Sequence, residues 1–124
     1  PPPLPPPVPL DPATTNRLDG LLAQVSAADS RFAAKTARAR SLVGAARKAA
    51  MGSEAWSVAS IAIAELESAR AEAMVAMAQL DSIYADARTE GRDVSQIERV
   101  RQKALAIIAA QDGVLDSLKG LLER

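Results

Sequence analysis

Apolar residues recur at alternating spacings of three and four in three separate segments of the chain. In the first segment the positions with this spacing are Leu18, Leu21, Val25, Ala28, Phe32, Lys35, Ala39, Leu42, Ala46 and Ala49, all apolar except Lys35. In the second they are Trp56, Ala59, Ile63, Leu66, Arg70, Ala73, Met77, Leu80, Tyr84 and Ala87, and in the third Ile97, Val100, Ala104, Ile107, Gln111, Val114, Leu118 and Leu121. This spacing marks one face of a packed helix, so the pattern predicts three amphipathic helices. Each apolar stripe contains one polar residue: Lys35, Arg70 or Gln111.

Glycines and capping side chains indicate where these helices begin and end. Gly52 and Gly91 lie where the neighbouring patterns lose register, and glycine readily adopts the left-handed conformation that follows a helix. Side chains able to cap the next helix stand before each segment: Asp11, Ser53, and Asp93 with Gln96 in the spacing of a capping box. We therefore predict helices over about residues 12–50, 54–88 and 94–122.

The lengths of these helices and of their connections predict the architecture. At 1.5 Å per residue the helices span about 45 to 58 Å, and turns of roughly three to five residues force neighbours to run antiparallel. We predict an all-α, coiled-coil-like fold, an elongated up-down-up three-helix bundle over residues 12–124. The alternative is a long hairpin whose third helix packs on another subunit.

All eight prolines lie within "PPPLPPPVPLDP" at the start of the chain. Proline lacks a backbone N–H and steers the preceding residue away from the helical conformation, so residues 1–11 are predicted to form an extended spacer. Because the chain begins with proline and not methionine, we expect that an export signal or anchor preceded it. This favours a periplasmic or cell-envelope location, with a cytoplasmic one as the alternative. Abundant alanine and a preference for arginine over lysine favour a bacterial source.

Composition argues against several classes of function. Apolar residues make up 48% of the chain but aromatic residues only 2%, so alanine-rich helices with thin, close contacts are expected. Fifteen basic and fifteen acidic residues cancel, which argues against a nucleic-acid-binding protein. The absence of histidine and cysteine excludes thiolate zinc sites and Cys or His nucleophiles. No apolar run is long enough to span a membrane. We expect no catalytic residue, cofactor or metal site, and therefore a non-enzymatic protein.

A basic run on the first helix is a candidate anion site, formed by Arg31, Arg38, Arg40, Arg47 and Lys48. An antiparallel hairpin that turns near Gly52 places residues side by side when their numbers sum to about 104. Arg31 should then lie near Glu72, and Arg38 near Glu65 or Glu67. We therefore favour ion pairing between the hairpin arms over a bound ligand.

A second apolar strip lies on the middle helix, on the face that the predicted bundle leaves outside. Its members are Val58, Ile61, Ala64, Ala71, Val75, Ala78 and Ala85. Alanines spaced by seven allow close helix contact, so we expect a partner helix or a homo-oligomer here, unless these alanines only raise helix propensity. The sequence thus favours a helical-bundle protein acting through helix-mediated protein–protein interaction or assembly. The alternative is a cytoplasmic anion- or nucleic-acid-binding module that uses the first helix.

Overall fold

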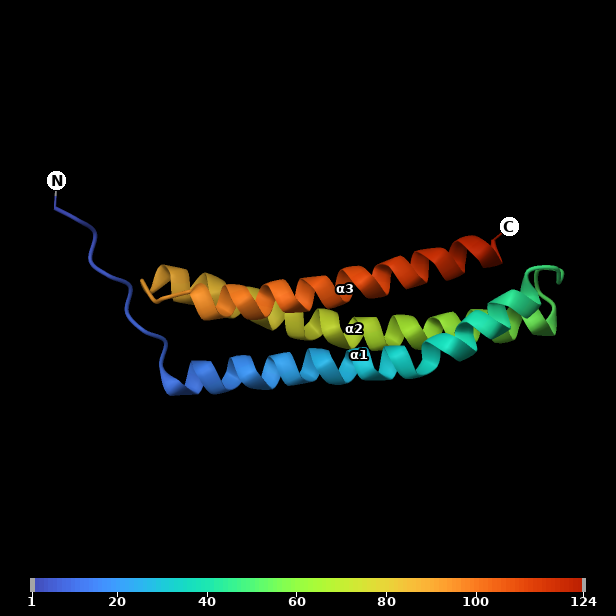
Figure 1. Ribbon diagram of the computed structural model, residues 1–124, viewed down its shortest axis with the longest axis horizontal. Coiled ribbons are helices and arrows are strands. Elements are labelled where there is room, and N and C mark those ends of the chain that lie inside the picture. Colours follow the sequence, from blue (N-terminus) through green and yellow to red (C-terminus); the bar gives the residue numbers. More distant parts are fainter. Residues whose placement is uncertain (1, 124) are drawn as a thin grey trace.

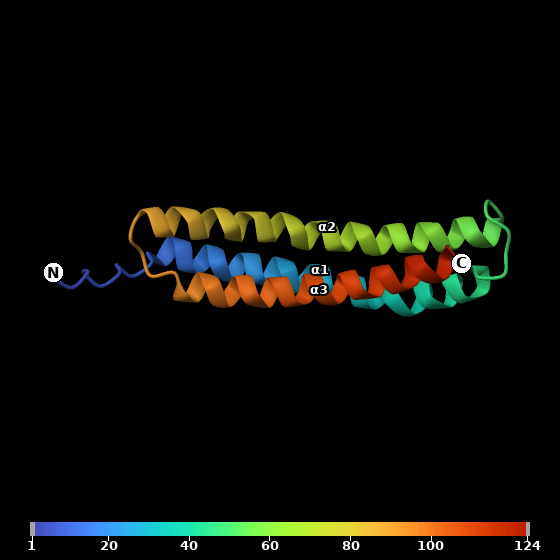
Figure 2. The same cartoon turned by 90° about the horizontal axis from the view of Figure 1, so that it is seen from above.

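The computed structural model describes residues 2–123, and these form three long helices packed side by side (Figure 1). The helices are α1 (Pro12–Ala46), α2 (Glu54–Thr89) and α3 (Ser95–Leu122). Helices α1 and α3 run in the same direction and α2 runs opposite to both (Figures 1 and 2). The predicted elongated up-down-up bundle is therefore confirmed, and α3 packs within its own chain against both other helices.

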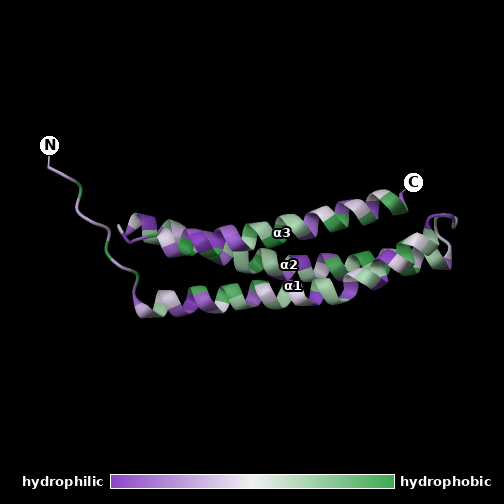
Figure 3. Ribbon diagram, viewed as in Figure 1, coloured by the Kyte–Doolittle hydropathy of each residue, from purple (hydrophilic) through white to green (hydrophobic). Residues whose placement is uncertain are grey.

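Apolar side chains from all three helices fill the interior of the bundle. The largest side chains with almost no exposed surface include Leu18, Val25, Val43, Leu66, Leu80, Ile97 and Leu118. Fully buried alanines lie between them, at Ala28, Ala39, Ala59, Ala73, Ala76 and Ala104. A methyl group fills little space, so these alanines let the helix backbones approach one another closely. Polar residues gather on the N-terminal half of α3, while α2 carries mostly apolar colour (Figure 3).

The buried face drifts away from a strict heptad stripe toward the C-terminal ends of α1 and α3. In α3 the buried residues are Ile108, Leu115 and Leu122, whereas Ile107, Val114 and Leu121 are half-buried. In α1 Val43 is buried, Leu42 is half-buried and Lys35 is exposed. A straight helix drifts by about 20° per heptad relative to a 3.5-residue repeat, which accounts for the one-residue shift. Lys35, the polar member of the first predicted stripe, therefore lies on the surface and not in the core.

The predicted signals for two helix starts and both turns are confirmed. Asp11 Oδ1 accepts a hydrogen bond from the Thr14 amide at 2.8 Å, and Ser53 Oγ accepts one from the Trp56 amide at 3.3 Å. Hydrogen bonds from the Thr14 side chain and backbone hold the pKa of the Asp11 carboxyl below its ordinary value. Gly52 and Gly91 both adopt the left-handed conformation, with φ values of 83° and 69°. Gly91 directly follows the C-cap of α2, as predicted, whereas Gly52 lies within the α1–α2 turn, well past the end of α1.

One predicted helix end and one predicted cap are wrong. Helix α1 ends at Ala46 and not near residue 50, because the next turn would add only alanine to the core before the chain crosses to Ser53. Helix α3 begins at Ser95, and its N-cap Val94 makes no side-chain capping bond. The Asp93 carboxylate instead accepts hydrogen bonds from the Ser95 amide at 2.9 Å and from its hydroxyl at 2.7 Å. The predicted capping box therefore does not form.

Residues 8–10, which we call the N-terminal strap, lie on the turn between α2 and α3. The Val8 amide donates to the Gly91 carbonyl at 3.0 Å, and the Asp93 amide donates to the Val8 carbonyl at 2.7 Å. The Arg92 guanidinium also donates to the Pro9 carbonyl at 3.0 Å, and Leu10 packs against the core. Residues before the strap extend away from the bundle (Figures 1 and 2).

We expect two glycine-to-alanine substitutions to have opposite effects on stability. Gly52→Ala should lower the free energy of unfolding by about 1 kcal/mol, because a side chain is strained at its positive φ. Gly113→Ala should raise it by up to about 1 kcal/mol, because Gly113 is inside α3 and a Cβ there would meet nothing within 4 Å. Chemical unfolding of both variants measures this, and equal effects in the same direction would contradict it.

Candidate functional site

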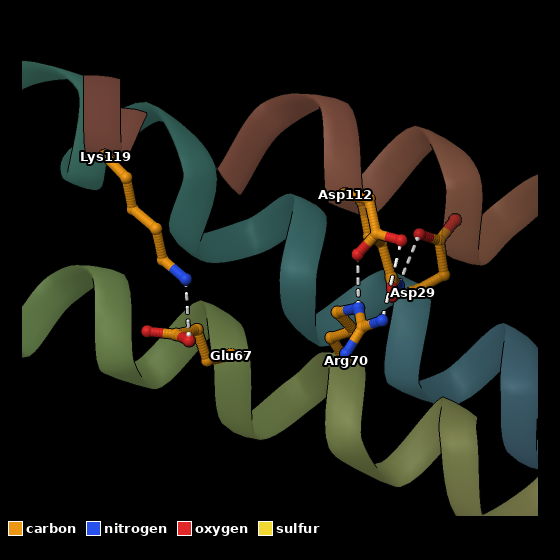
Figure 4. A network of polar contacts seen from close by, with 6 residues as sticks. Asp29, Glu67, Arg70, Asp112 and Lys119 are labelled. Atoms are coloured by element: carbon orange, nitrogen blue, oxygen red, sulfur yellow. Dashed lines mark hydrogen bonds and ion pairs between the residues drawn. The ribbon is translucent and has the colours of Figure 1, made fainter. Parts of the chain in front are cut away.

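A layer of polar side chains crosses the middle of the bundle and divides its core in two. One apolar cluster lies toward the α2–α3 turn and ends at Ala28, Ala73 and Ile108. The other lies toward the α1–α2 turn and begins at Phe32, Ala69 and Leu115. The layer between them consists of Asp29 from α1, Arg70 from α2, and Gln111 and Asp112 from α3 (Figure 4).

Polar contacts in this layer connect α3 to each of the other two helices, to α1 through Gln111 and Asp29 and to α2 through Asp112 and Arg70. Gln111 Nε2 donates to Asp29 Oδ1 at 3.1 Å, and Gln111 is only 2% exposed. Among residues 2–123, Gln111 Oε1 finds no hydrogen-bond partner. The Arg70 guanidinium makes an ion pair with Asp112 and also reaches the second carboxylate oxygen at 3.5 Å. Because Arg70 is already occupied by Asp112, the layer reads as a connection between helices and not as a ligand site.

The sequence pattern identified only half of this layer. Arg70 and Gln111 interrupt apolar stripes and were predicted in the seam, whereas Asp29 and Asp112 lie one residue outside the stripes. Applying to the second hairpin the counting rule used for the first would have paired Arg70 with Asp112. No comparable signal identifies Asp29, because its partner lies on a helix that is not its neighbour in sequence.

Some of the basic residues of α1 form ion pairs with glutamates of α2. Arg31 is paired with Glu72, as predicted, and Lys35 Nζ lies 4.0 Å from the Glu65 carboxylate. Arg38 lies beside Glu65 in the lining of a hollow between α1 and α2. The ion pairs between hairpin arms therefore involve the N-terminal half of the run.

The remaining members of the basic run are dispersed. Arg40 lines an open groove between α1 and α3, together with Phe32, Thr36 and Val114. Arg47 and Lys48 are exposed in the α1–α2 turn, and the described part of the chain places no carboxylate within 4.0 Å of either. The predicted anion-site residues thus do not converge on one location.

The outer face of α2 carries the strip predicted from the sequence. Six of its members are exposed, namely Ile61, Ala64, Ala71, Val75, Ala78 and Ala85, and Val58 is half-buried. Ile61 is 61% exposed and Val75 is 55% exposed. Ser57, Ser68, Ser82 and Thr89 are also exposed and complete an uncharged row with alternating spacings of three and four, which we call the outer strip. The apolar pattern alone does not identify the serines and Thr89, because their side chains are polar.

Four carboxylates beside the middle of the outer strip are paired with bases of the neighbouring helices. Glu72 and Glu65 are paired with Arg31 and Lys35 of α1. On the other side Glu67 is 3.0 Å from Lys119, and Asp81 is 2.9 Å from Arg101, both in α3. The row itself carries no charge, and its middle section is bordered by ion pairs formed within one chain.

Two adjoining hollows lie next to the outer strip near the α1–α2 turn. One, of about 240 Å³, is lined by residues that include Leu42, Val58 and Ile61. The other, of about 350 Å³, is lined by Leu42, Ala45, Glu54, Ala55 and Val58. Since both share Leu42 and Val58, they form a continuous apolar depression between α1 and α2. This end of the strip can accept side chains from a neighbouring helix.

Membrane-spanning helices and metal-binding clusters are two further features that bear on function. No helix within residues 2–123 is long and apolar enough to cross a membrane, and no group of three or more acidic side chains there is arranged to hold a metal ion. Comparison with known proteins supplies no assignment: no protein-family profile, curated protein sequence or solved structure matches this chain significantly.

Proposed function

We propose that this protein is a non-enzymatic assembly module that binds a partner helix against the outer strip of α2. The observation that carries the proposal is the exposure of Ile61 and Val75 within an uncharged, heptad-spaced row. Burying these two aliphatic side chains against a partner would stabilise the complex by about 25 cal/mol for each Å² of apolar surface removed from water. The spacing of three and four is the one that lets two helices pack along their length.

The surroundings of the strip support helix binding in two ways. The side chains between the large residues are alanine and serine. Because they project little from the helix, a second helix can approach the α2 backbone closely along several turns. The apolar depression at Leu42 and Val58 adds space for side chains of the partner at one end. A helix placed here would convert the three-helix bundle into a four-helix arrangement.

Position-specific photo-crosslinking in cells that make the protein tests this proposal. We expect a photoreactive residue at Ala64, Ala71 or Ala78 to give adducts of higher mass. The same residue at Ala27 or Ala34, exposed alanines seven apart on α1, serves as the matched control and should give none. Adducts that follow the strip support the proposal, and equal labelling of both helices, or none on α2, overturns it.

Anion or nucleic-acid binding through α1 finds less support, because Arg31 and Lys35 are paired with α2 and the other bases are spread over separate places. Salt-dependent retention of DNA at physiological ionic strength would favour that alternative. Location in the periplasm or cell envelope stays a prediction, which fractionation of the producing cells tests.

A further inference from the structure

We propose that the helix bound by the outer strip belongs to a second copy of this chain, arranged antiparallel about a two-fold axis near residues 69 and 70 of α2. This inference rests on the proposed function, since it names the occupant of the same surface. It is carried by side-chain sizes along the strip and by the charges on both sides of it.

Side-chain sizes in the outer strip are complementary only when the two copies run in opposite directions. Ile61, Ser68 and Val75 occupy one heptad position, and Ala64, Ala71 and Ala78 occupy the other. In an antiparallel pair the first kind of position faces the second kind. Ile61 then meets Ala78 of the second copy, and Val75 meets its Ala64. Each large residue packs against a small one, and the helix separation stays even along the seam.

A parallel pair fits the same strip less well. Identical positions would face each other, so Ile61 would meet Ile61 and Val75 would meet Val75. The alanine and serine layers between them would then be too far apart to touch, because aliphatic pairs hold the helices at a larger spacing. Lost contacts of this kind remove the packing energy of the three layers between Ile61 and Val75. The antiparallel arrangement is therefore preferred.

The charges beside the strip also suit a second copy better than a charged partner. On the α1 side, Glu65 approaches Glu72 of the second copy, but Lys35 and Arg31 already pair with these carboxylates and place two bases among them. On the α3 side, Glu67 comes opposite Met74 of the second copy, and no like charges meet. Since the chain has fifteen basic and fifteen acidic residues, two copies do not repel each other. Because four of the carboxylates beside the strip are already paired within the chain, a strongly basic helix would gain few unpaired counter-charges here.

The mass of the protein in solution tests the self-association. We expect light scattering to give twice the mass of one chain, and Ala71→Glu combined with Ala78→Glu to return it to that of a monomer. The matched control, Ala27→Glu with Ala34→Glu, adds the same two carboxylates to exposed α1 positions and should leave the dimer intact. Circular dichroism with thermal melting shows whether each variant is folded.

Disulfide trapping tests the antiparallel register independently of those variants, because the natural chain contains no cysteine. In the proposed register Ser68 of one copy faces Ala71 of the other, so Ser68→Cys with Ala71→Cys should give covalent dimers on mild oxidation. Ala85→Cys is the control: its two copies lie far apart when antiparallel but adjacent when parallel. Efficient trapping at Ala85 would overturn the antiparallel arrangement.

The outcomes separate this inference from the proposed function. A wild-type chain that stays monomeric at every concentration overturns the second copy as occupant, while strip-specific photo-crosslinks to another protein would still uphold helix binding. A dimer that survives both glutamates on α2 overturns the outer strip as its seam. A dimer lost only in the α2 variant, and trapped only through residues 68 and 71, supports the inference.

Discussion

Gln111→Glu is expected to lower the free energy of unfolding by about 3 to 5 kcal/mol at pH 7. Gln111 is 2% exposed, and its amide nitrogen donates to the Asp29 carboxylate at 3.1 Å. The substitution keeps the shape of the side chain but replaces that donor by a second carboxylate. Two like charges then face each other where little water can solvate the new one.

The pH dependence of this loss identifies its cause. Burial beside Asp29 raises the folded-state pKa of the introduced carboxyl above its unfolded value of about 4.3. Below about pH 4.3 the group is protonated in both states and the variant should approach wild-type stability. The penalty grows as pH rises from there toward the folded-state pKa. Urea unfolding of both proteins at pH 4 and pH 7 measures it, and an equal difference at both pH values would contradict the electrostatic explanation.

Gln111→Leu provides the control of opposite sign. It removes the buried oxygen Oε1, for which the described residues offer no partner, and it joins the two apolar clusters into one. Asp29 is half-buried, so water can replace the lost amide donor. We expect a gain of about 1 kcal/mol in the free energy of unfolding.

Leu66→Ala is expected to cost about 3 to 5 kcal/mol of unfolding free energy. Leu66 has no exposed surface and lies in the cluster toward the α1–α2 turn, where many buried neighbours are alanines. Alanines cannot extend into the space that the leucine leaves, so a cavity remains and adds to the lost transfer energy.

The matched control for this truncation is Leu105→Ala in α3. Leu105 is 42% exposed, and its loss should change the free energy of unfolding by only about 0.5 kcal/mol. Denaturant unfolding of both variants gives the comparison. A cost below about 1 kcal/mol for Leu66→Ala would show that the half of the bundle next to the α1–α2 turn is loosely packed.

Much of the fold could be predicted because periodicity reports directly on burial. Stripes of apolar residues separated by Gly52 and Gly91 were enough to predict three helices in an up-down-up arrangement. The exposed position of the α2 strip followed from that arrangement. The errors come from finer effects. Leu42 was predicted in the seam in place of Val43 because a strict heptad ignores the drift of a straight helix. Alanine continues the pattern beyond Ala46 but contributes too little apolar surface to extend α1.

Contacts between elements far apart in the sequence could not be predicted in the same way. Asp29 meets Gln111 only because α1 and α3 are neighbours in the finished bundle. The strap was expected to be a plain spacer, and its hydrogen bonds to Gly91 and Asp93 involve backbone groups, which carry no sequence signal. Such contacts depend on where turns lie in space, which one-dimensional patterns do not encode.

The strap also determines how the molecule would respond to a mechanical load. Tension applied to the residues before Val8 passes first into its hydrogen bonds with Gly91 and Asp93, and through the Arg92–Pro9 contact into the α2–α3 turn. The first turn of α1 is loaded only after these bonds break. While the strap remains attached, a force on the proline segment is therefore carried by the α2–α3 turn and does not unwind the first turn of α1.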